Sequence, residues 1–337
     1  MGVNLSDIVD GRTIEIDDLA GQVIAVDALN WIYQFLTIIR QPDGQPLADS
    51  SGRVTSHLSG LFYRTAKLMQ AGIKPVYVFD GVPSELKSAA LGKRRDVRAE
   101  ALREWKEALK KEDYEEARRQ ASRSTTVNEE MLNDSRRLLA AMGVPTIQAP
   151  SEGEALCSLM TARGDARAAA TQDYDALLFG CPRVVRNLSI TGKRRRGSGV
   201  VTINPEMLVL DDVLTSLGIT QSQLILVGML VGTDFNPGGI PGFGPKKALQ
   251  AVREKKTLKS VFSNLPWSFD ASPDEIYEFF HRPIETSYHI DFRPLDASAV
   301  RQVLCAEHDF SEERIDNTLQ KLSESKKLEQ NSLRKWF

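Results

Sequence analysis

Short apolar runs alternate with amphipathic segments along the first half of the chain. Residues 22–27 and 75–80 have the composition of strands that are buried on both faces. The segments 28–40 and 54–70 repeat apolar residues at helical spacing, and Gly72 follows as an end signal. Strands that are separated by helices predict a parallel sheet with helices packed on its faces.

Two more short apolar segments, at 144–148 and 167–172, continue this alternation, and helical patterns predominate from Asn204 onward. The predicted fold class is therefore α/β, with a parallel-sheet core followed by a helical region. Before the third strand, Thr126 and Glu129 have the spacing of a capping box, which predicts a new helix starting there.

A densely charged segment at 93–123 interrupts the strand-helix alternation. Its apolar residues follow a helical period, and its basic residues outnumber its acidic ones. The pattern fits a solvated helix stabilised by i,i+4 ion pairs as well as it fits a functional basic insertion.

The composition bounds the class of protein without identifying it. The chain has 337 residues, of which 42% are hydrophobic, enough for two domains or one large core with additions. Its 43 Lys and Arg residues nearly balance 45 Asp and Glu residues, for a formal net charge of −2. This sum argues against a simple basic nucleic-acid coat protein, although it does not show how the charge is distributed. No apolar stretch has the length of a membrane span, so we expect no membrane association.

The N-terminal sequence and the cysteines favour a reducing compartment. The first residues lack the basic and apolar regions of a secretory signal. Gly2 fits the loose N-myristoylation pattern, but no second membrane signal accompanies it. Cys157, Cys181 and Cys305 lie far apart, which predicts neither a zinc site nor a disulfide framework.

Carboxylates follow the ends of all four predicted strands, and one more follows an apolar helix. These residues are Asp27, Asp80, Glu152, Glu154, Asp173, Asp175 and Asp234. The carboxyl ends of parallel strands form one edge of a sheet, where ligands bind. Ligand sets made only of oxygen select hard cations such as Mg²⁺ or Mn²⁺. Two such ions about 4 Å apart are suited to hydrolysing a phosphodiester.

Each of these acids also has a simpler interpretation. An Asp after a strand is a common helix cap, and Glu154 could close a capping box with Ser151. The Asp173-Tyr174-Asp175 pair also resembles the DxD of aspartyl phosphatases and glycosyltransferases, but it comes late in the chain and Ala176 follows it. Four consecutive strand ends that all carry acids favour the metal site.

Basic residues lie where they could face these acids. Lys87 and Arg94 are seven residues apart, so they share a face of a helix that begins beside Asp80. Their charges would suit a phosphate whose negative charge builds in the transition state, although two solvent-facing cations would look the same in sequence.

The segment 240–247 predicts a turn that opens a helix. Gly242 and Gly244 precede Pro245, which is favoured at the first position of a helix, and Lys246 and Lys247 follow. Free N–H groups at a helix start bind phosphate, so the segment is suited to contact with a DNA backbone without base reading. A plain helix-helix turn is the alternative.

Together these motifs resemble the flap endonuclease family, structure-specific 5′ nucleases of the XPG/PIN-like superfamily. The resemblance covers nearly the whole chain and rests on the segments 24–36, 76–94, 149–155, 170–175 and 242–247. It implies a PIN-like parallel-sheet nuclease core with a helical arch and a helix–two-turn–helix. The implied divisions are 1–92 and 126–233 for the nuclease core, 93–125 for the arch, 234–325 for the helix–two-turn–helix with the C-terminal helices, and 326–337 for a tail.

The resemblance also implies roles for the site residues. Asp27, Asp80, Glu152 and Glu154 would hold one metal ion, and Asp173, Asp175 and Asp234 would hold the second. Lys87 and Arg94 would contact the scissile phosphate. Mg²⁺ is the implied cofactor, with Mn²⁺ as a substitute, and a monovalent cation could bind at the helix–two-turn–helix, whose approach through 236–239 looks one residue longer than usual.

The implied DNA contacts come from several segments. Tyr33 would stack on a base, and Gly2 would lie near the active site. Arg40 and Arg64 would contact the template strand, and Thr55 would help line a pocket for a one-nucleotide 3′ flap. The residues that would contact the duplex backbone are Gly242, Gly244, Lys246 and Lys247.

The C-terminal residues resemble a sliding-clamp-binding box, which implies a PCNA-type partner. The matching positions are Gln330, Leu333, Trp336 and Phe337, with Trp336 in place of the usual Phe or Tyr. We expect an exposed tail that folds on docking, and a frayed terminus is the alternative. The chain stops at this box and so resembles archaeal members, which predicts a cytoplasmic protein, or a nuclear one in a eukaryote.

The sequence therefore predicts a Mg²⁺-dependent 5′ flap endonuclease, with 5′-3′ exonuclease activity, that acts in lagging-strand maturation and long-patch repair. Its partner would be branched DNA with a 5′ flap, and we expect a monomer. A related 5′ exonuclease, gap endonuclease or RNA-acting nuclease is an alternative within the same class. An inactive scaffold that binds DNA and the clamp is the alternative from another class.

Overall fold

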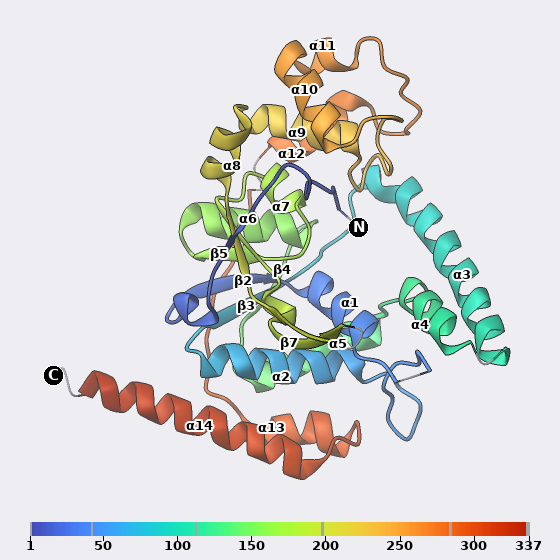
Figure 1. Ribbon diagram of the computed structural model, residues 1–337. Coiled ribbons are helices and arrows are strands. Elements are labelled where there is room, and N and C mark those ends of the chain that lie inside the picture. The colour runs from blue at the N-terminus through green and yellow to red at the C-terminus, as the bar shows by residue number, and fades with distance from the viewer. Residues whose placement is uncertain (1, 42, 112, 197–198, 283–284, 335–337) are drawn as a thin grey trace.

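A computed structural model provides the structure of the protein (Figure 1). It describes residues 2–41, 43–111, 113–196, 199–282 and 285–334, and within these it leaves the side chains of 85, 88–91, 93–95, 118, 193–196, 199–201 and 326–334 outside the description. Within the described residues, one seven-stranded sheet forms the centre, and a separate two-stranded ribbon lies beside it.

The central sheet is mixed and has the strand order β1-β9-β6-β5-β2-β3-β4. Its strands are β1 (Arg12–Thr13), β2 (Val23–Asp27), β3 (Lys74–Phe79), β4 (Thr146–Gln148), β5 (Ala168–Ala170), β6 (Arg183–Arg186) and β9 (Glu206–Val209). The strands β2 to β6 run parallel, as the sequence predicts, whereas β9 pairs antiparallel with both β6 and β1. The two-stranded ribbon consists of β7 (Gly192–Arg196) and β8 (Gly199–Ile203).

Helices cover both faces of the sheet because its buried strands are apolar on both sides. Along β2, Ile24 and Val26 face one apolar core while Ala25 faces the other. The core that holds Ile24 and Val26 includes α1 (Ala28–Ile38), α2 (Ser56–Gln70), α5 (Glu129–Ala141), α13 (Ala297–Arg301) and α14 (Glu312–Arg334). The other core includes α6 (Gly153–Arg163), α7 (Asp175–Leu178), α8 (Leu210–Leu217), α9 (Gln221–Val231), α10 (Pro245–Lys255), α11 (Leu258–Phe262) and α12 (Pro273–His281).

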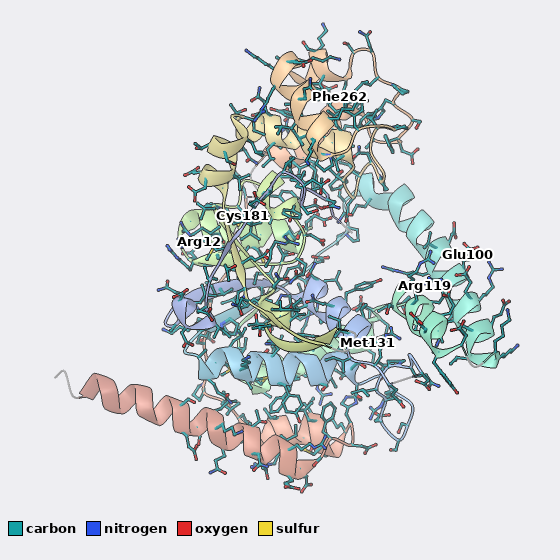
Figure 2. The ribbon with its side chains drawn as sticks, viewed as in Figure 1. Arg12, Glu100, Arg119, Met131, Cys181 and Phe262 are labelled. Atoms are coloured by element: carbon teal, nitrogen blue, oxygen red, sulfur yellow. The ribbon has the colours of Figure 1, made fainter. Side chains whose placement is uncertain are left out.

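Two helices form an arm that stands away from the sheet. The long helix α3 (Ser88–Lys110) folds back on α4 (Tyr114–Arg123), and together they reach along one side of the molecule (Figure 1). Glu100 on α3 and Arg119 on α4 mark this arm in Figure 2. The helical period that the sequence shows over 93–123 is therefore confirmed, and the segment is a helical hairpin.

Short helical turns complete the chain. They are the 3₁₀ turns η1 (Ile16–Leu19), η2 (Glu85–Lys87) and η3 (Leu188–Ile190), and the π-helical turn η4 (Gln302–Ala306). In the described part of the chain, no single helix is long and apolar enough to cross a bilayer; α8 and α9 pass that test only as a pair, bent by 78°.

Two local predictions differ from the structure. The capping box at Thr126 is wrong, because Asn128 caps α5 with its side chain and Glu129 is already the first helical residue. The tail expected from residue 330 also differs in its backbone conformation, because α14 continues as a helix to Arg334. The observed cap of α5 lies two residues after the predicted one, within the usual spread of helix boundaries.

Candidate active site

The site lies where the order in which strands are added to the sheet reverses. From β2 the chain adds β3 and β4 on one side, and then returns to place β5 on the other side of β2. The carboxyl ends of β2 and β5 therefore flank a topological switch point, where a crevice forms and ligands bind in α/β sheets. Asp27 ends β2 and Asp173 follows β5, so both flank this crevice.

Asp27 and Asp80 are each fixed by one backbone donor. The N–H of Asn30 donates to Oδ1 of Asp27 at 3.0 Å, which makes Asp27 the cap of α1 as well as a site residue. The N–H of Gly153, at the start of α6, donates to Oδ1 of Asp80 at 2.7 Å. The simpler interpretation of a helix cap is thus correct for Asp27, but it does not remove Asp27 from the acidic edge.

The turns after β3 and β4 approach each other closely. The N–H of Gly81 donates to the carbonyl oxygen of Ser151 at 2.6 Å, and a Cβ on Gly81 would lie only 2.1 Å from the carbonyl oxygen of Ala149. Only glycine fits there. The contact brings Asp80 and Glu152, which follow these two strands, to the same place.

Thr171 joins the two groups of acids that the sequence analysis separates. Its hydroxyl donates to Oε1 of Glu154 at 2.8 Å and accepts the N–H of Asp173 at 3.2 Å. The side-chain amide of Asn30 donates to Oδ2 of Asp173 at 3.1 Å. Sequence reasoning missed both residues. The signals are a hydroxyl that directly follows the buried alanine strand β5 and an amide in the first turn of α1, the helix that follows β2.

The N-terminal segment reaches into the site, as predicted for Gly2. The N–H of Val3 donates to Oδ1 of Asp175 at 2.7 Å, and Val3 itself is buried. A Cβ on Gly2 would lie 2.6 Å from Oδ2 of Asp175 and 3.0 Å from Cβ of Asp173. The segment therefore packs directly against the second group of acids.

Lys87 provides positive charge within this cluster. It pairs with Glu152, and its Nζ lies 3.4 Å from Oδ2 of Asp234, the residue that follows α9. Its Nζ also lies 5.6 Å from the centre of the Phe235 ring. Burial disfavours the charged ammonium, but Glu152 and Asp234 together outweigh that effect and raise the pKa of Lys87.

Burial and mutual repulsion raise the pKa values of several carboxylates in the cluster. Burial raises the pKa of Asp80 to about 6, with a further contribution from Glu152. Burial and the charge of Asp234 raise the pKa of Asp175 to about 7. The pKa values of Asp27 and Glu154 are also raised, first by burial and then by their carboxylate neighbours. Positive charge in addition to Lys87 would relieve this repulsion.

The chemistry of the donor set fits hard divalent cations. Every candidate ligand is a carboxylate, the donor type that Mg²⁺ and Mn²⁺ prefer. Among the residues that the structure describes, no three Asp, Glu, His or Cys side chains are closed around one point. Lys87 pairs with Glu152 and Asp234, one carboxylate from each of the two predicted metal-holding groups.

Tyr33 on α1 and Arg40 just after it, two predicted DNA-contact residues, already have partners in the protein. The guanidinium of Arg98, on α3, lies 5.6 Å from the centre of the Tyr33 ring. Arg40 donates to the carbonyl of Gly44 at 2.7 Å and to Oγ1 of Thr125 at 2.6 Å. Burial lowers the pKa of Arg40. Two residues that sequence reasoning assigned to DNA thus contact other parts of the protein: Tyr33 contacts the arm at Arg98, and Arg40 contacts the segment after α4 at Thr125.

Arg64 and Thr55 are likewise held in place. Arg64 donates to the carbonyl oxygen of Thr191 at 3.0 Å. Thr55 is buried, and its neighbours Val54 and His57 line a cavity of about 250 Å³. A cavity therefore lies beside Thr55, whose own side chain is covered, and the role of Thr55 in a 3′-flap pocket stays a prediction.

The turn before α10 has the predicted form. Gly242 has a φ of +84°, Gly244 caps the helix, and Pro245 is its first residue. Lys246 and Lys247 are exposed on the first turn, and Nζ of Lys247 lies 5.0 Å from the centre of the neighbouring Phe243 ring. In the approach at 236–239, Gly238 and Gly239 have left-handed backbone, and its extra length relative to the family stays a prediction.

Part of the predicted site lies outside the described residues. The side chains of Arg94, Gln330 and Leu333 are not described, and neither are Trp336 and Phe337. Their roles stay predictions.

The sheet and its acidic edge define the class of the protein, an XPG-type nuclease. The family model of the XPG N-terminal domain matches residues 1–101, and that of the XPG I-region matches residues 143–234. The solved structure of flap endonuclease-1 from Methanococcus jannaschii has a TM-score of 0.77 and 38% identity, covering 96% of this chain and 98% of that one.

Sequence relatives narrow the class to one family. Flap endonuclease 1 of Pyrococcus furiosus is 52% identical over 341 residues, which cover 100% of this chain and 99% of the relative. Flap endonuclease 1 of Staphylothermus marinus is 48% identical over 349 residues, with full coverage of both chains. The chain belongs to the flap endonuclease family. The catalytic core of Rad2, solved in complex with DNA substrate, shares the fold with a TM-score of 0.72 at 23% identity over 96% of this chain and 100% of that one.

Proposed function

We propose that this chain hydrolyses a DNA phosphodiester at the point where a 5′ single-stranded flap meets a duplex, and that it also has 5′-3′ exonuclease activity. The observation that carries the proposal is that carboxylates from four strand ends and from the segment after α9 lie close enough to raise one another's pKa values, with Lys87 paired to two of them. The full-length relatives named flap endonuclease 1 support the choice of substrate. The roles that follow are lagging-strand maturation and long-patch repair.

We infer that Mg²⁺ is the ion used, with Mn²⁺ as a substitute. Asp27, Asp80, Glu152 and Glu154 would hold one ion, and Asp173, Asp175 and Asp234 would hold the second. Divalent ions held there would supply an activated water and neutralise the charge that builds on the phosphate.

The chain's own residues have separate tasks in this scheme. The Val3 N–H and Thr171 hydroxyl fix the direction of the carboxylates that they contact. Lys87 places one positive charge at the acidic edge, where it can turn from its carboxylate partners toward a phosphate oxygen. Hydrolysis leaves a 5′-phosphate and a 3′-hydroxyl.

The DNA path that we propose uses both ends of the site. The exposed Lys246 and Lys247 at the start of α10 would contact the duplex backbone without reading bases. Tyr33 and the α3-α4 arm would meet the 5′ single strand. Arg40 would reach the template strand by exchanging its hydrogen bonds to Gly44 and Thr125.

The remaining assignments also stand as proposals. A monovalent cation would bind at the turn before α10, a PCNA-type clamp would bind the C-terminal residues, and the protein would act as a monomer in the cytoplasm of an archaeal-type cell.

Cleavage of three substrates by the full chain with Mg²⁺ tests the function. We expect a double-flap substrate to be cut fastest, a nicked duplex more slowly, and a single strand least. Asp175→Asn should abolish cleavage while flap binding remains, because it removes charge from the acidic edge but not from the DNA-binding surface. Equal rates on all three substrates would contradict flap specificity, and full-rate cleavage by the variant would contradict the metal assignment.

A further inference from the structure

We propose that Thr171 and Asn30 are positioning residues that set the spacing between the two groups of metal-holding carboxylates. The proposal rests on the two-metal function above and adds residues to it. Neither side chain is a ligand in that scheme. Both act through Asp173, which belongs to the second group, and each also contacts the first group.

Thr171 lies at the place where a side chain can join both groups. It directly follows β5, and only 2% of it is exposed. A hydroxyl has one proton to donate and lone pairs to accept with. Thr171 gives the proton to Glu154 and accepts the N–H of Asp173, so one oxygen atom links α6 to the turn after β5.

Asn30 makes the corresponding link across the switch point. Its backbone N–H holds Asp27 and its side-chain amide holds Asp173 at 3.1 Å. Its Oδ1 also lies 3.4 Å from the N–H of Gln172, which agrees with the amide orientation that the contact with Asp173 requires. Asn30 therefore ties the first turn of α1 to the turn that carries the second group.

These links oppose a force that is present in the site. The negative charge of Asp173 repels the neighbouring carboxylates of Glu154 and Asp27. Carboxylates that repel move apart unless something holds them, and two metal ions work as a pair only at a separation of about 4 Å. Two neutral hydrogen-bonding side chains hold the turn without adding charge, so they leave the affinity for cations intact.

The shape of the turn explains why side chains, and not regular backbone hydrogen bonds, must hold Asp173 in place. The strand β5 ends at Ala170, and α7 begins at Asp175, so Asp173 lies on an irregular segment with no ladder or helix of its own. Groups that orient metal ligands from outside typically change metal affinity or activity about 10- to 100-fold when they are lost.

Direct Mn²⁺ binding by the full chain without DNA tests the proposal apart from catalysis. We compare wild type with Thr171→Val, which keeps the shape and loses the hydroxyl, and Thr171→Ser, which keeps the hydroxyl. We expect Thr171→Val to weaken at least one Mn²⁺ by about tenfold or more in calorimetry, and Thr171→Ser to stay within about twofold of wild type. Electron paramagnetic resonance should show loss of the magnetic coupling between two bound ions in Thr171→Val but not in Thr171→Ser.

Asn30→Leu is the independent second variant, since Asn30 is only partly buried and its replacement leaves the backbone bond to Asp27 in place. We expect the same loss of Mn²⁺ affinity and coupling. Melting temperatures of the variants in EDTA separate a specific loss of Mn²⁺ binding from a general loss of stability. Unchanged binding and coupling in both folded variants would overturn the positioning role, whereas a wild-type protein that binds no Mn²⁺ would overturn the proposed two-metal function.

Discussion

The Nζ atom of Lys87 lies 3.4 Å from Oδ2 of Asp234. Lys87 stands at the foot of the α3-α4 arm, and Asp234 stands at the end of α9, where the chain turns toward α10. The ion pair therefore joins the start of the α3-α4 arm to the segment that leads into α10. We assign DNA binding to both, and the pair lies directly at the acidic edge. This position gives Lys87 a role in chemistry and makes it the first residue to test.

Replacement of Lys87 by alanine should slow the chemical step by about 10²- to 10³-fold, as expected for the loss of one charge-stabilising donor. The measurement is the single-turnover rate on a double-flap substrate at saturating enzyme. Lys74→Ala is the matched control, because Lys74 is exposed at the opposite end of β3. A single-turnover rate equal to that of wild type would contradict the role.

The metal-free protein should lose stability as the pH rises from about 5 to 8. Burial raises the pKa of Asp80 to about 6 and that of Asp175 to about 7, so the folded state keeps protons that the unfolded chain has already released. Deprotonation of the folded state then favours unfolding. We expect a melting temperature in EDTA lower at pH 8 than at pH 5.5 by about 5 °C or more.

Added Mg²⁺ should reduce this difference, because cations favour the charged carboxylates. Asp175→Asn should flatten the profile and raise the metal-free melting temperature at pH 8. Below about pH 4 stability should fall for a different reason, since hydrogen bonds lower the pKa of Glu307 and Asp309 and protonation breaks them. A melting temperature in EDTA that rises steadily to pH 8 would show that the acids are not buried together as described.

Gly2→Ala should impair cleavage although it adds a single methyl group. The new Cβ would lie 2.6 Å from Oδ2 of Asp175, so the N-terminal segment or the carboxylate must shift. We expect weaker Mn²⁺ binding and a slower single-turnover rate, by about tenfold or more. Gly92→Ala is the control, because in the described part of the chain nothing lies within 4 Å of a Cβ there. Equal metal affinity in wild type and Gly2→Ala would mean that the segment yields without moving Asp175.

Deletion of residues 330–337 should remove stimulation by a sliding clamp and leave basal cleavage unchanged. The clamp box is remote in sequence from every carboxylate of the site, and the site makes no use of it. The assay compares cleavage with and without a PCNA-type clamp for both proteins. Stimulation that survives the deletion would place the clamp contact elsewhere on the chain.

The sequence by itself determined the buried parallel strands and the acids that follow them. An apolar strand such as β2 can be recognised because it is buried on both faces, and Asp27, Asp80 and Asp173 then fall at strand ends by position alone. The helical period of the arm and the turn before α10 were also readable, since both depend on local spacing and on glycine and proline.

Tertiary structure decided which of these parts meet. The reversal between β4 and β5 brings Asp173 beside Asp27, and no local pattern predicts strand order. The same is true of the contacts of Thr171 and Asn30, of the Val3 amide on Asp175, and of the antiparallel strand β9. Hydrogen bonds between segments far apart in sequence depend on packing, and for that reason the sequence predicted the ligands of the site but not the residues that hold them in place.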